Sequence, residues 1–182
     1  MNQVNLDKFD NGWYKPASKL KNWFWYFTNL LFFKTTFPFP STIKVKILKA
    51  FGSTVGNAVV IKPNVNIKYP WFLTVGDNCW VGENVWIDNL ALVTIGNNVC
   101  LSQGTYLVTG SHDYKKEAFD LLLGEIVLED GVWIGANATV CPNVVCKSHS
   151  VLAVGSIATQ NLNDYGIYQG NPARFKRKRD MI

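Results

Sequence analysis

The two histidines of this chain are the side chains best suited to move a proton at neutral pH, because an imidazole titrates near 6.5. His112 belongs to a Thr-Gly-Ser-His-Asp segment, residues 109–113, and stands at the start of an irregular stretch. Loops on a rigid scaffold carry function. His112 is therefore the candidate catalytic residue, able to accept or donate a proton, and general acid–base catalysis typically contributes about 10²–10⁴ in rate. His149 has regular sequence on both sides, and we predict that it is a surface residue.

No other pattern of reactive side chains competes with this base. The chain has no Ser-His-Asp arrangement with evident spacing, and its two histidines lie 37 residues apart, which leaves zinc few ligands. The four cysteines lack metal-ligand spacing and are predicted to be free thiols in a reducing, cytoplasmic compartment. They are Cys79, Cys100, Cys141 and Cys146. The chemistry expected of His112 requires neither a metal nor a covalent intermediate.

The element that must position His112 is visible as a six-residue rhythm of aliphatic residues. Such a hexapeptide repeat predicts a parallel β-helix, an all-β solenoid in which each triangular coil stacks on the next. One aliphatic side chain per strand points inward, so reactive polar side chains must lie outside the triangle. The repeating positions are Val55, Ile61, Ile67, Val75, Val81, Ile87, Ile95, Leu101, Leu107, Leu128, Ile134, Val140, Cys146, Leu152 and Ala158.

The phase of the repeat predicts about five coils and a loop between two of them. The first three coils begin at Val55, Val75 and Ile95, so each carries a two-residue insertion at the same corner. The rhythm then stops for about 15 residues after His112 and resumes at Leu128. We therefore expect residues 113–125 to form a loop that leaves the solenoid directly after the candidate base.

The segments on either side of the repeat are predicted to cap its two ends. We divide the chain into residues 1–52 as an N-terminal helical and aromatic cap, 53–163 as the β-helix, and 164–182 as a C-terminal cap and basic tail. Residues 174–179 are predicted to form a short basic helix. Apolar residues at helical spacing predict two N-terminal helices that cover the open first coil: Leu20, Trp23, Phe24, Phe27, Leu30 and Leu31, then Ile43, Ile47, Leu48 and Phe51.

Charge is distributed unevenly along the sequence, and this distribution limits the classes of molecule that the protein is expected to bind. Of the net charge of +5, residues 1–52 carry +6, residues 53–173 carry −5, and the tail from Arg174 carries +4. The solenoid body has no basic footprint for nucleic acid. A basic, aromatic N-terminal segment suits peripheral contact with an anionic membrane, an alternative compatible with the capping role. The longest apolar run, residues 23–33, is too short to span a bilayer, and no signal peptide is expected. We expect a cytoplasmic protein, with the inner face of the membrane as a further possibility.

These residues together resemble the hexapeptide-repeat acyltransferases, whose members include galactoside, maltose and antibiotic acetyltransferases. The resemblance covers residues 55–179 and rests on the repeats, the His112 segment, Val-Trp-Ile-Gly-Ala at 132–136 and Gly-Asn-Pro-Ala at 170–173. Tyr-Pro-Trp at 69–71, residues 85–90 and residues 100–103 are similar to the colanic-acid acetyltransferase branch of that family. That branch serves cell-surface polysaccharide synthesis.

The resemblance implies a left-handed parallel β-helix that assembles as a homotrimer, with active sites in clefts between neighbouring subunits. Acetyl-CoA would lie along such a cleft as co-substrate, and the acceptor would be a sugar or glycan. His112 matches the histidine that takes the proton of the acceptor hydroxyl. The backbone amide of Ala136 matches the donor that holds the tetrahedral oxyanion, a contribution of about 3 kcal/mol.

Further site residues are assigned from the same resemblance. Asp88 and its neighbour Asn89 are predicted to contact the acceptor; Asp88 is also a candidate to orient His112, or it is only a corner residue. Trp86 offers a flat face to a sugar ring and Trp133 to the pantetheine arm, although either can be filler of the repeat. The predicted acetyl-CoA contacts are Trp133, Ala136, Val154, Thr159, Arg174, Arg177 and Lys178. Arginine suits the phosphates because its guanidinium group matches their oxygens.

A β-helix of this kind is compatible with two other functions. A γ-class carbonic anhydrase needs three histidines on zinc, and the chain has only two. A non-catalytic solenoid that acts as a scaffold or surface-binding protein would be indifferent to His112→Ala. The sequence does not choose the sugar, the acylated hydroxyl, or a lipid-linked rather than a free acceptor.

Overall fold

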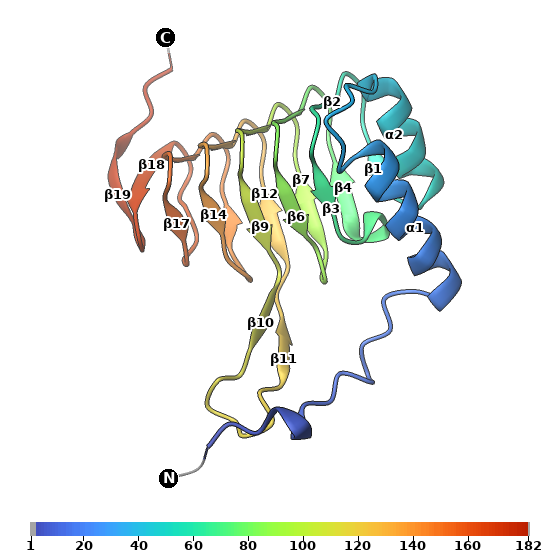
Figure 1. Cartoon of the computed structure of the whole chain (residues 1–182). Helices are drawn as coiled ribbons and strands as arrows, with labels where there is room; N and C mark the ends of the chain where they lie inside the picture. The colour runs from blue at the N-terminus through green and yellow to red at the C-terminus, as the bar shows by residue number, and fades with distance from the viewer. Residues whose placement is uncertain (1–2, 182) are drawn as a thin grey trace.

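The structure is a computed structural model that describes residues 3–181. It is a parallel β-helix with two helices at one end, a β-hairpin at the other end, and a second hairpin that protrudes from one corner (Figure 1). The first sheet contains β1 (Thr54–Val55), β4 (Leu73–Val75), β7 (Val93–Ile95), β12 (Ile126–Leu128) and β15 (Val145–Cys146). The third contains β3 (Asn66–Ile67), β6 (Trp86–Asp88), β9 (Tyr106–Val108), β14 (Thr139–Val140) and β17 (Ile157–Ala158).

The second sheet extends further along the axis than the other two. It contains β2 (Val60–Ile61), β5 (Trp80–Val81), β8 (Cys100–Leu101), β13 (Trp133–Ile134), β16 (Val151–Leu152), β18 (Gly166–Gly170) and β19 (Ala173–Lys178). Five coils are complete, and a partial sixth follows, in which Leu162 bridges to Cys146 and β18 pairs with β16. The predicted coil number is therefore confirmed, with an incomplete turn added.

The register of the strands confirms the six-residue repeat and the position of its interruption. Val55, Val75 and Ile95 pair in sequence, and Ile95 pairs directly with Leu128 across the interruption. All fifteen repeating aliphatic positions are buried. The insertions and the interruption all fall at the corner that follows the third sheet, which we call the third corner, so they leave the stacked strands undisturbed.

The interruption is partly a β-hairpin rather than only a loop. β10 (Gly110–His112) pairs antiparallel with β11 (Leu121–Leu123), so the pairing starts before the predicted loop and uses part of it. The N-terminal segment supports the hairpin, since the Asn5 amide donates to the Glu117 carbonyl at 2.9 Å and Lys8 forms a 2.8 Å ion pair with Glu117. This segment contains the short 3-10 helix η1 (Leu6–Lys8), and a second one, η2 (Pro70–Phe72), lies at the third corner.

Two helices cap the first coil, as the apolar spacing predicted. They are α1 (Lys19–Phe32) and α2 (Ser41–Ala50). Their side chains satisfy backbone groups that the open edge would otherwise expose. The Trp25 indole donates to the Ile67 carbonyl at 2.9 Å, and the buried Lys44 ammonium group donates to the Lys62 carbonyl at 2.8 Å. Burial lowers the pKa of Lys44.

The apolar face of α1, which was predicted to cover the first coil, faces away from that coil. Trp25 and Asn29 are its buried residues, whereas the six apolar residues assigned to the capping face are all exposed. The capping face instead uses an indole and an amide, because the edge of a coil presents backbone carbonyls and polar side chains that need hydrogen-bond partners. The helical period was correctly predicted, and an apolar face is left exposed in the described part of the chain.

The predicted C-terminal helix at residues 174–179 is wrong, because residues 173–178 form the strand β19. β19 pairs antiparallel with β18 from Gly166↔Lys178 to Gly170↔Ala173. The open edge of the sixth coil supplies a row of hydrogen-bond partners, and a short turn at residues 171–172 folds the tail back onto it. Pairing with that edge therefore outweighs the helical tendency of a segment rich in lysine and arginine.

Neither helix of the described part of the chain is long and apolar enough to cross a membrane.

Candidate active site

His112 is held at the end of β10 between two aromatic rings. Its ring lies parallel to that of Phe119, with centroids 4.3 Å apart and an angle of 8°, and the Phe9 ring lies 5.5 Å away. The Nδ1 atom lies 2.8 Å from the carbonyl oxygen of Phe119. Because a carbonyl oxygen only accepts, Nδ1 must carry the hydrogen, and the lone pair of a neutral ring is then on Nε2. This is the state that a general base requires.

His149, predicted to be a surface residue, is half-buried at a regular corner. Its backbone has a φ of 59°, and its ring packs against Tyr165 with centroids 4.8 Å apart. A Cβ on Gly131 would collide with this ring, which explains why glycine occupies that position in the coil below. His149 is therefore a packing residue of a corner and not a second base.

A groove of about 560 Å³ runs along the outside of the second sheet. Trp133, Ala136, Val154 and Arg177, four of the seven residues predicted to contact acetyl-CoA, line this groove. They come from two successive coils and the C-terminal hairpin, so only stacking brings them together. The Trp133 indole donates to the Ser102 hydroxyl at 2.9 Å, which fixes the ring as one wall.

The Ala136 amide is available as a hydrogen-bond donor in this groove. Ala136 is half-buried, and its carbonyl accepts from the Gly155 amide at 2.8 Å. The neighbouring amide of Asn137 donates to the Gln103 carbonyl at 2.9 Å. Within residues 3–181 the Ala136 N–H itself has no acceptor. Such an amide can stabilise a developing oxyanion, as predicted for this residue.

Three of the predicted acetyl-CoA contacts do not line the groove. Thr159, Arg174 and Lys178 are exposed, and the Arg174 guanidinium group lies 3.4 Å from the Gln160 side-chain oxygen. The groove instead includes Arg179, whose guanidinium group donates to the Gly131 carbonyl at 3.0 Å. Arg177 lies on β19 and Arg179 follows the last residue of that strand, and the extended chain brings both to the groove. The predicted helix would not have paired them.

A carboxylate surrounded by phenols lies at the end of β6. The Tyr106 hydroxyl donates to Asp88 at 3.3 Å, and the Tyr106 ring stacks on Trp86 with centroids 4.8 Å apart. Burial, and then the charge of Asp88, raise the pKa of Tyr106 to about 12 and also raise the pKa of Tyr69. These phenols therefore keep their protons at neutral pH and remain hydrogen-bond donors.

Tyr14 completes this aromatic corner from the N-terminal segment. Its hydroxyl donates to the Leu90 carbonyl at 2.6 Å, and its pKa is raised by burial, by Tyr69 and by Asp88. The sequence pattern indicated Asp88 and Trp86 as residues of this corner, but not Tyr14 or Tyr106. Tyr106 was detectable from the repeat, since it lies 20 residues after Trp86, one coil later; Tyr14 had no such signal.

Asn89 is not an acceptor contact, which corrects the prediction. Its side chain is fully buried, and its amide group donates to the carbonyls of Tyr69 at 2.6 Å and Phe72 at 3.1 Å, while its oxygen accepts from the Tyr69 amide. Asn89 therefore holds the two-residue insertion of one coil against the next.

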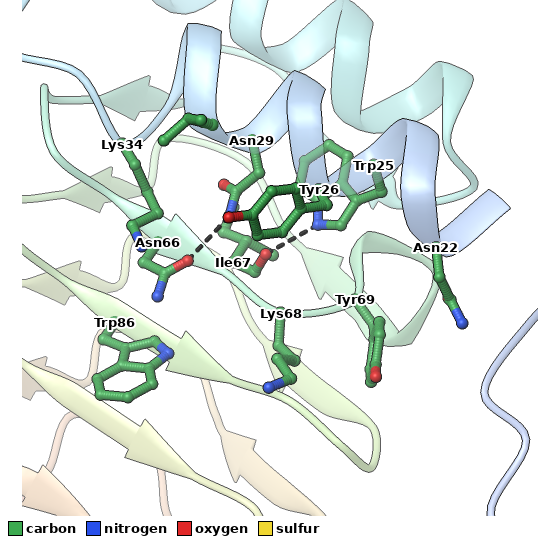
Figure 2. A pocket seen from close by; sticks show the side chains of 11 residues that line it. Asn22, Trp25, Tyr26, Asn29, Lys34, Asn66, Ile67, Lys68, Tyr69 and Trp86 are labelled. Atoms are coloured by element: carbon green, nitrogen blue, oxygen red, sulfur yellow. Dashed lines mark hydrogen bonds between the residues drawn. The ribbon is translucent and has the colours of Figure 1, made fainter. Parts of the chain in front are cut away.

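A second cavity, of about 440 Å³, lies between α1 and the first two coils (Figure 2). Figure 2 shows Lys34, Lys68 and Trp86 around it, with Asn29 bonded to Asn66 across its upper wall at 2.9 Å. The side-chain oxygens of Asn22 and Asn29 are buried and have no hydrogen-bond partner within residues 3–181. The cavity thus combines aromatic surface with ammonium groups, and it shares Trp86 with the corner of Asp88.

None of the four cysteines lines the groove or the second cavity. The four cysteines are free thiols, and burial raises the pKa of Cys146 to about 12. In the described part of the chain no group of three or more His, Cys, Asp or Glu residues is placed to hold a metal ion.

Comparison with known proteins supports the resemblance. No protein-family model matches the chain. The chain is 38% identical over 133 residues to the putative colanic acid biosynthesis acetyltransferase WcaF of Escherichia coli, and the match covers 73% of each chain. The chain belongs to the hexapeptide-repeat acetyltransferase family. The left-handed form of β-helix implied by the resemblance is the fold of this family.

Solved structures agree with this assignment. A hexapeptide-repeat acetyltransferase of Vibrio cholerae, determined with acetyl-CoA, is 27% identical with a TM-score of 0.73 and covers 80% of this chain and 81% of its own. A galactoside acetyltransferase in complex with coenzyme A has a TM-score of 0.77 at 23% identity, covering 88% and 82% of the two chains. The second likeness concerns the fold alone.

Proposed function

We propose that this protein, an acyltransferase by its family, transfers the acetyl group of acetyl-CoA to a sugar hydroxyl in cell-surface polysaccharide synthesis, with His112 as general base. The observation that carries the proposal is the hydrogen bond between Nδ1 of His112 and the Phe119 carbonyl. That bond leaves Nε2 as the acceptor for a hydroxyl proton. A packing histidine such as His149 has no need of this arrangement.

The groove along the second sheet suits the acetyl-CoA donor. Its walls include Trp133 and Val154, which offer apolar surface to a pantetheine arm, and Arg177 and Arg179 supply positive charge for phosphate oxygens. Ala136, whose amide has no acceptor within residues 3–181, lines the same groove. The residues present therefore fit the thioester donor that relatives are reported to bind.

The reaction then follows from these groups. The acceptor hydroxyl gives its proton to Nε2 of His112 as its oxygen attacks the thioester carbonyl, and the Ala136 amide stabilises the resulting oxyanion. When the C–S bond breaks, the proton held by His112 passes to the departing thiolate, and coenzyme A leaves as the thiol. The products are an acetylated sugar and coenzyme A.

The homotrimer is part of the proposal because one chain holds only fragments of a site. The groove that contains Ala136 lies on the second sheet, whereas His112 lies on the hairpin of the third corner and does not line that groove. Packing three copies side by side would bring the hairpin of one subunit to the groove of the next. Clefts between subunits are then the places where base and donor meet.

The acceptor is proposed to bind at the corner of Asp88 and the adjoining cavity. The exposed face of Trp86 suits the apolar face of a sugar ring, and the Asp88 carboxylate suits its hydroxyls. Asp88 is not bonded to His112, whose orientation comes from the Phe119 carbonyl, so its role is with the acceptor.

The decisive experiment is release of free thiol from acetyl-CoA by the full-length protein across a panel of glycosides. We expect release to depend on the glycoside and to fall by at least about 10²-fold in His112→Ala. His149→Asn is the matched control, because asparagine tolerates the positive φ of that corner. Equal turnover of native protein and His112→Ala would remove the imidazole from its role, and absence of turnover with every glycoside would favour a non-catalytic scaffold.

A further inference from the structure

Helix α1 presents an apolar face that no part of residues 3–181 covers. The side chains of Trp23, Phe24 and Phe27 are 57%, 51% and 41% exposed, and the Trp23 ring lies 5.4 Å from the ring of Phe24 and 4.7 Å from that of Phe27. The complete face consists of Leu20, Trp23, Phe24, Phe27, Leu30 and Leu31. A contiguous apolar surface of this kind on a folded protein marks an interaction site.

The charge around this face has a single sign. The chain contains no aspartate or glutamate between Asp10 and Asp77, and nine lysines lie in that interval: Lys15, Lys19, Lys21, Lys34, Lys44, Lys46, Lys49, Lys62 and Lys68. On α2, which packs beside α1 at the same end of the solenoid, Lys46 and Lys49 are exposed beside Ile43 (Figure 1). The end of the molecule is therefore both apolar and cationic.

We propose that α1 and α2 dock this end of the solenoid on an anionic lipid bilayer. The apolar face of α1 would enter the interface of the bilayer, and the exposed lysines would lie among the anionic headgroups. α1 is too short to span a bilayer, so it must lie in the plane of the surface. Pairing of this end with a second copy of itself is disfavoured, because it would oppose like charges.

Docking would also orient the candidate acceptor site. The cavity lined by Lys34 and Trp86 lies on the inner side of α1, between the helix and the first two coils (Figure 2). A bilayer on the outer side of α1 would therefore bring this cavity close to the membrane surface. The docking inference does not depend on the proposed acetyl transfer, since it rests on the exposed surface alone.

The test is co-sedimentation of the full-length protein with vesicles of phosphatidylcholine, alone or mixed with phosphatidylglycerol. We expect binding to the mixed vesicles that weakens as salt is added. Phe24→Ser combined with Phe27→Ser should lower the partition coefficient at least about tenfold. Lys46→Gln and Lys49→Gln should lower it about fivefold each.

Matched controls lie elsewhere on the surface. Trp80→Ser removes an exposed aromatic residue of β5, and Lys147→Gln and Lys176→Gln remove charges nearer the opposite end; none should change binding. The inference is overturned if the native protein stays in the supernatant with both kinds of vesicle, or if Trp80→Ser reduces binding as much as the double phenylalanine variant. It is also overturned if that double variant changes the sedimentation coefficient of the protein without lipid, because α1 would then be a subunit interface.

Discussion

The two histidines occupy corners of opposite character. His149 lies at the corner after the first sheet, where every coil has the same length and the ring fills the space left by Gly131. His112 lies at the third corner, where the chain leaves the solenoid for a hairpin and a backbone carbonyl holds the ring. The same side chain is packing in one place and a candidate base in the other. In this solenoid, the candidate base lies where the repeat is interrupted.

The difference between the two corners has a physical cause. A regular corner must match the coils above and below it, so its side chains are committed to stacking. The third corner lies outside the hydrogen-bonded strands, and β7 pairs with β12 whether or not a hairpin is inserted between them. Residues can therefore be added there without loss of the core.

The largest expected effect lies in the regular body. Leu101→Ala removes a buried side chain from the inner column and should lower the free energy of unfolding by about 2–5 kcal/mol, because a cavity remains between rigidly stacked coils. Urea unfolding measures this loss. A similar loss from Leu122→Ala, a half-exposed residue of the hairpin, would contradict the separation of body and corner.

A second prediction concerns the buried thiol of Cys146 in the regular coils and its titration at alkaline pH. Burial raises the pKa of the Cys146 thiol from 9.0 to about 12 in the folded state. The stability associated with the protonated thiol is present below pH 9 and is lost as the pH rises from about 9 toward 12, by up to about 4 kcal/mol. Urea unfolding between pH 7 and pH 12 should therefore show a smaller alkaline loss for Cys146→Ala than for the native protein. Identical slopes would mean that the thiolate is not destabilising in the core.

A third, smaller effect is expected at the third corner. Phe119→Gly keeps the carbonyl that bonds Nδ1 of His112 and suits the positive φ of 52°, but it removes the stacked ring. We expect turnover to fall by up to about tenfold, since such aromatic contacts contribute about 0.5–1.5 kcal/mol. Stability and the KM for acetyl-CoA should stay unchanged. A large loss of stability would show that the hairpin belongs to the folding core.

The smallest effect is expected at the regular corner. His149→Asn should change the free energy of unfolding by about 0.5 kcal/mol or less and leave turnover unchanged, because asparagine adopts the left-handed backbone readily. His149→Val, with a β-branched side chain at the same φ, should cost more. Equal stability of the two variants would show that backbone conformation does not limit this corner.

The stacked coils were predictable from the sequence, whereas the structure at the two ends of the solenoid was not. The phase of the aliphatic residues predicts each inward position, because every coil must stack on the same column. At the ends no neighbouring coil imposes that pattern. The tail from Arg174 was predicted as a helix and is a strand up to Lys178, and the apolar face of α1 was predicted to cover the first coil and is exposed.

The residues of the candidate site also fall into two groups, those that the sequence predicted and those that only the structure revealed. His112 was identifiable because it stands where the repeat stops, and Trp133 and Ala136 because they belong to a motif. Arg179 and Tyr14 gave no signal, since the first depends on the pairing of β19 with β18 and the second on a contact across 76 residues.

By itself the sequence determined the stacked coils, the interruption and the single candidate base, because hydrophobic period and phase are local properties of a chain. Only the tertiary structure decided which nitrogen of His112 carries its hydrogen, which arginines reach the groove and which side of α1 is left for a partner. Those features depend on backbone carbonyls and sheet edges contributed by distant segments, and their positions exist only after the coils have stacked.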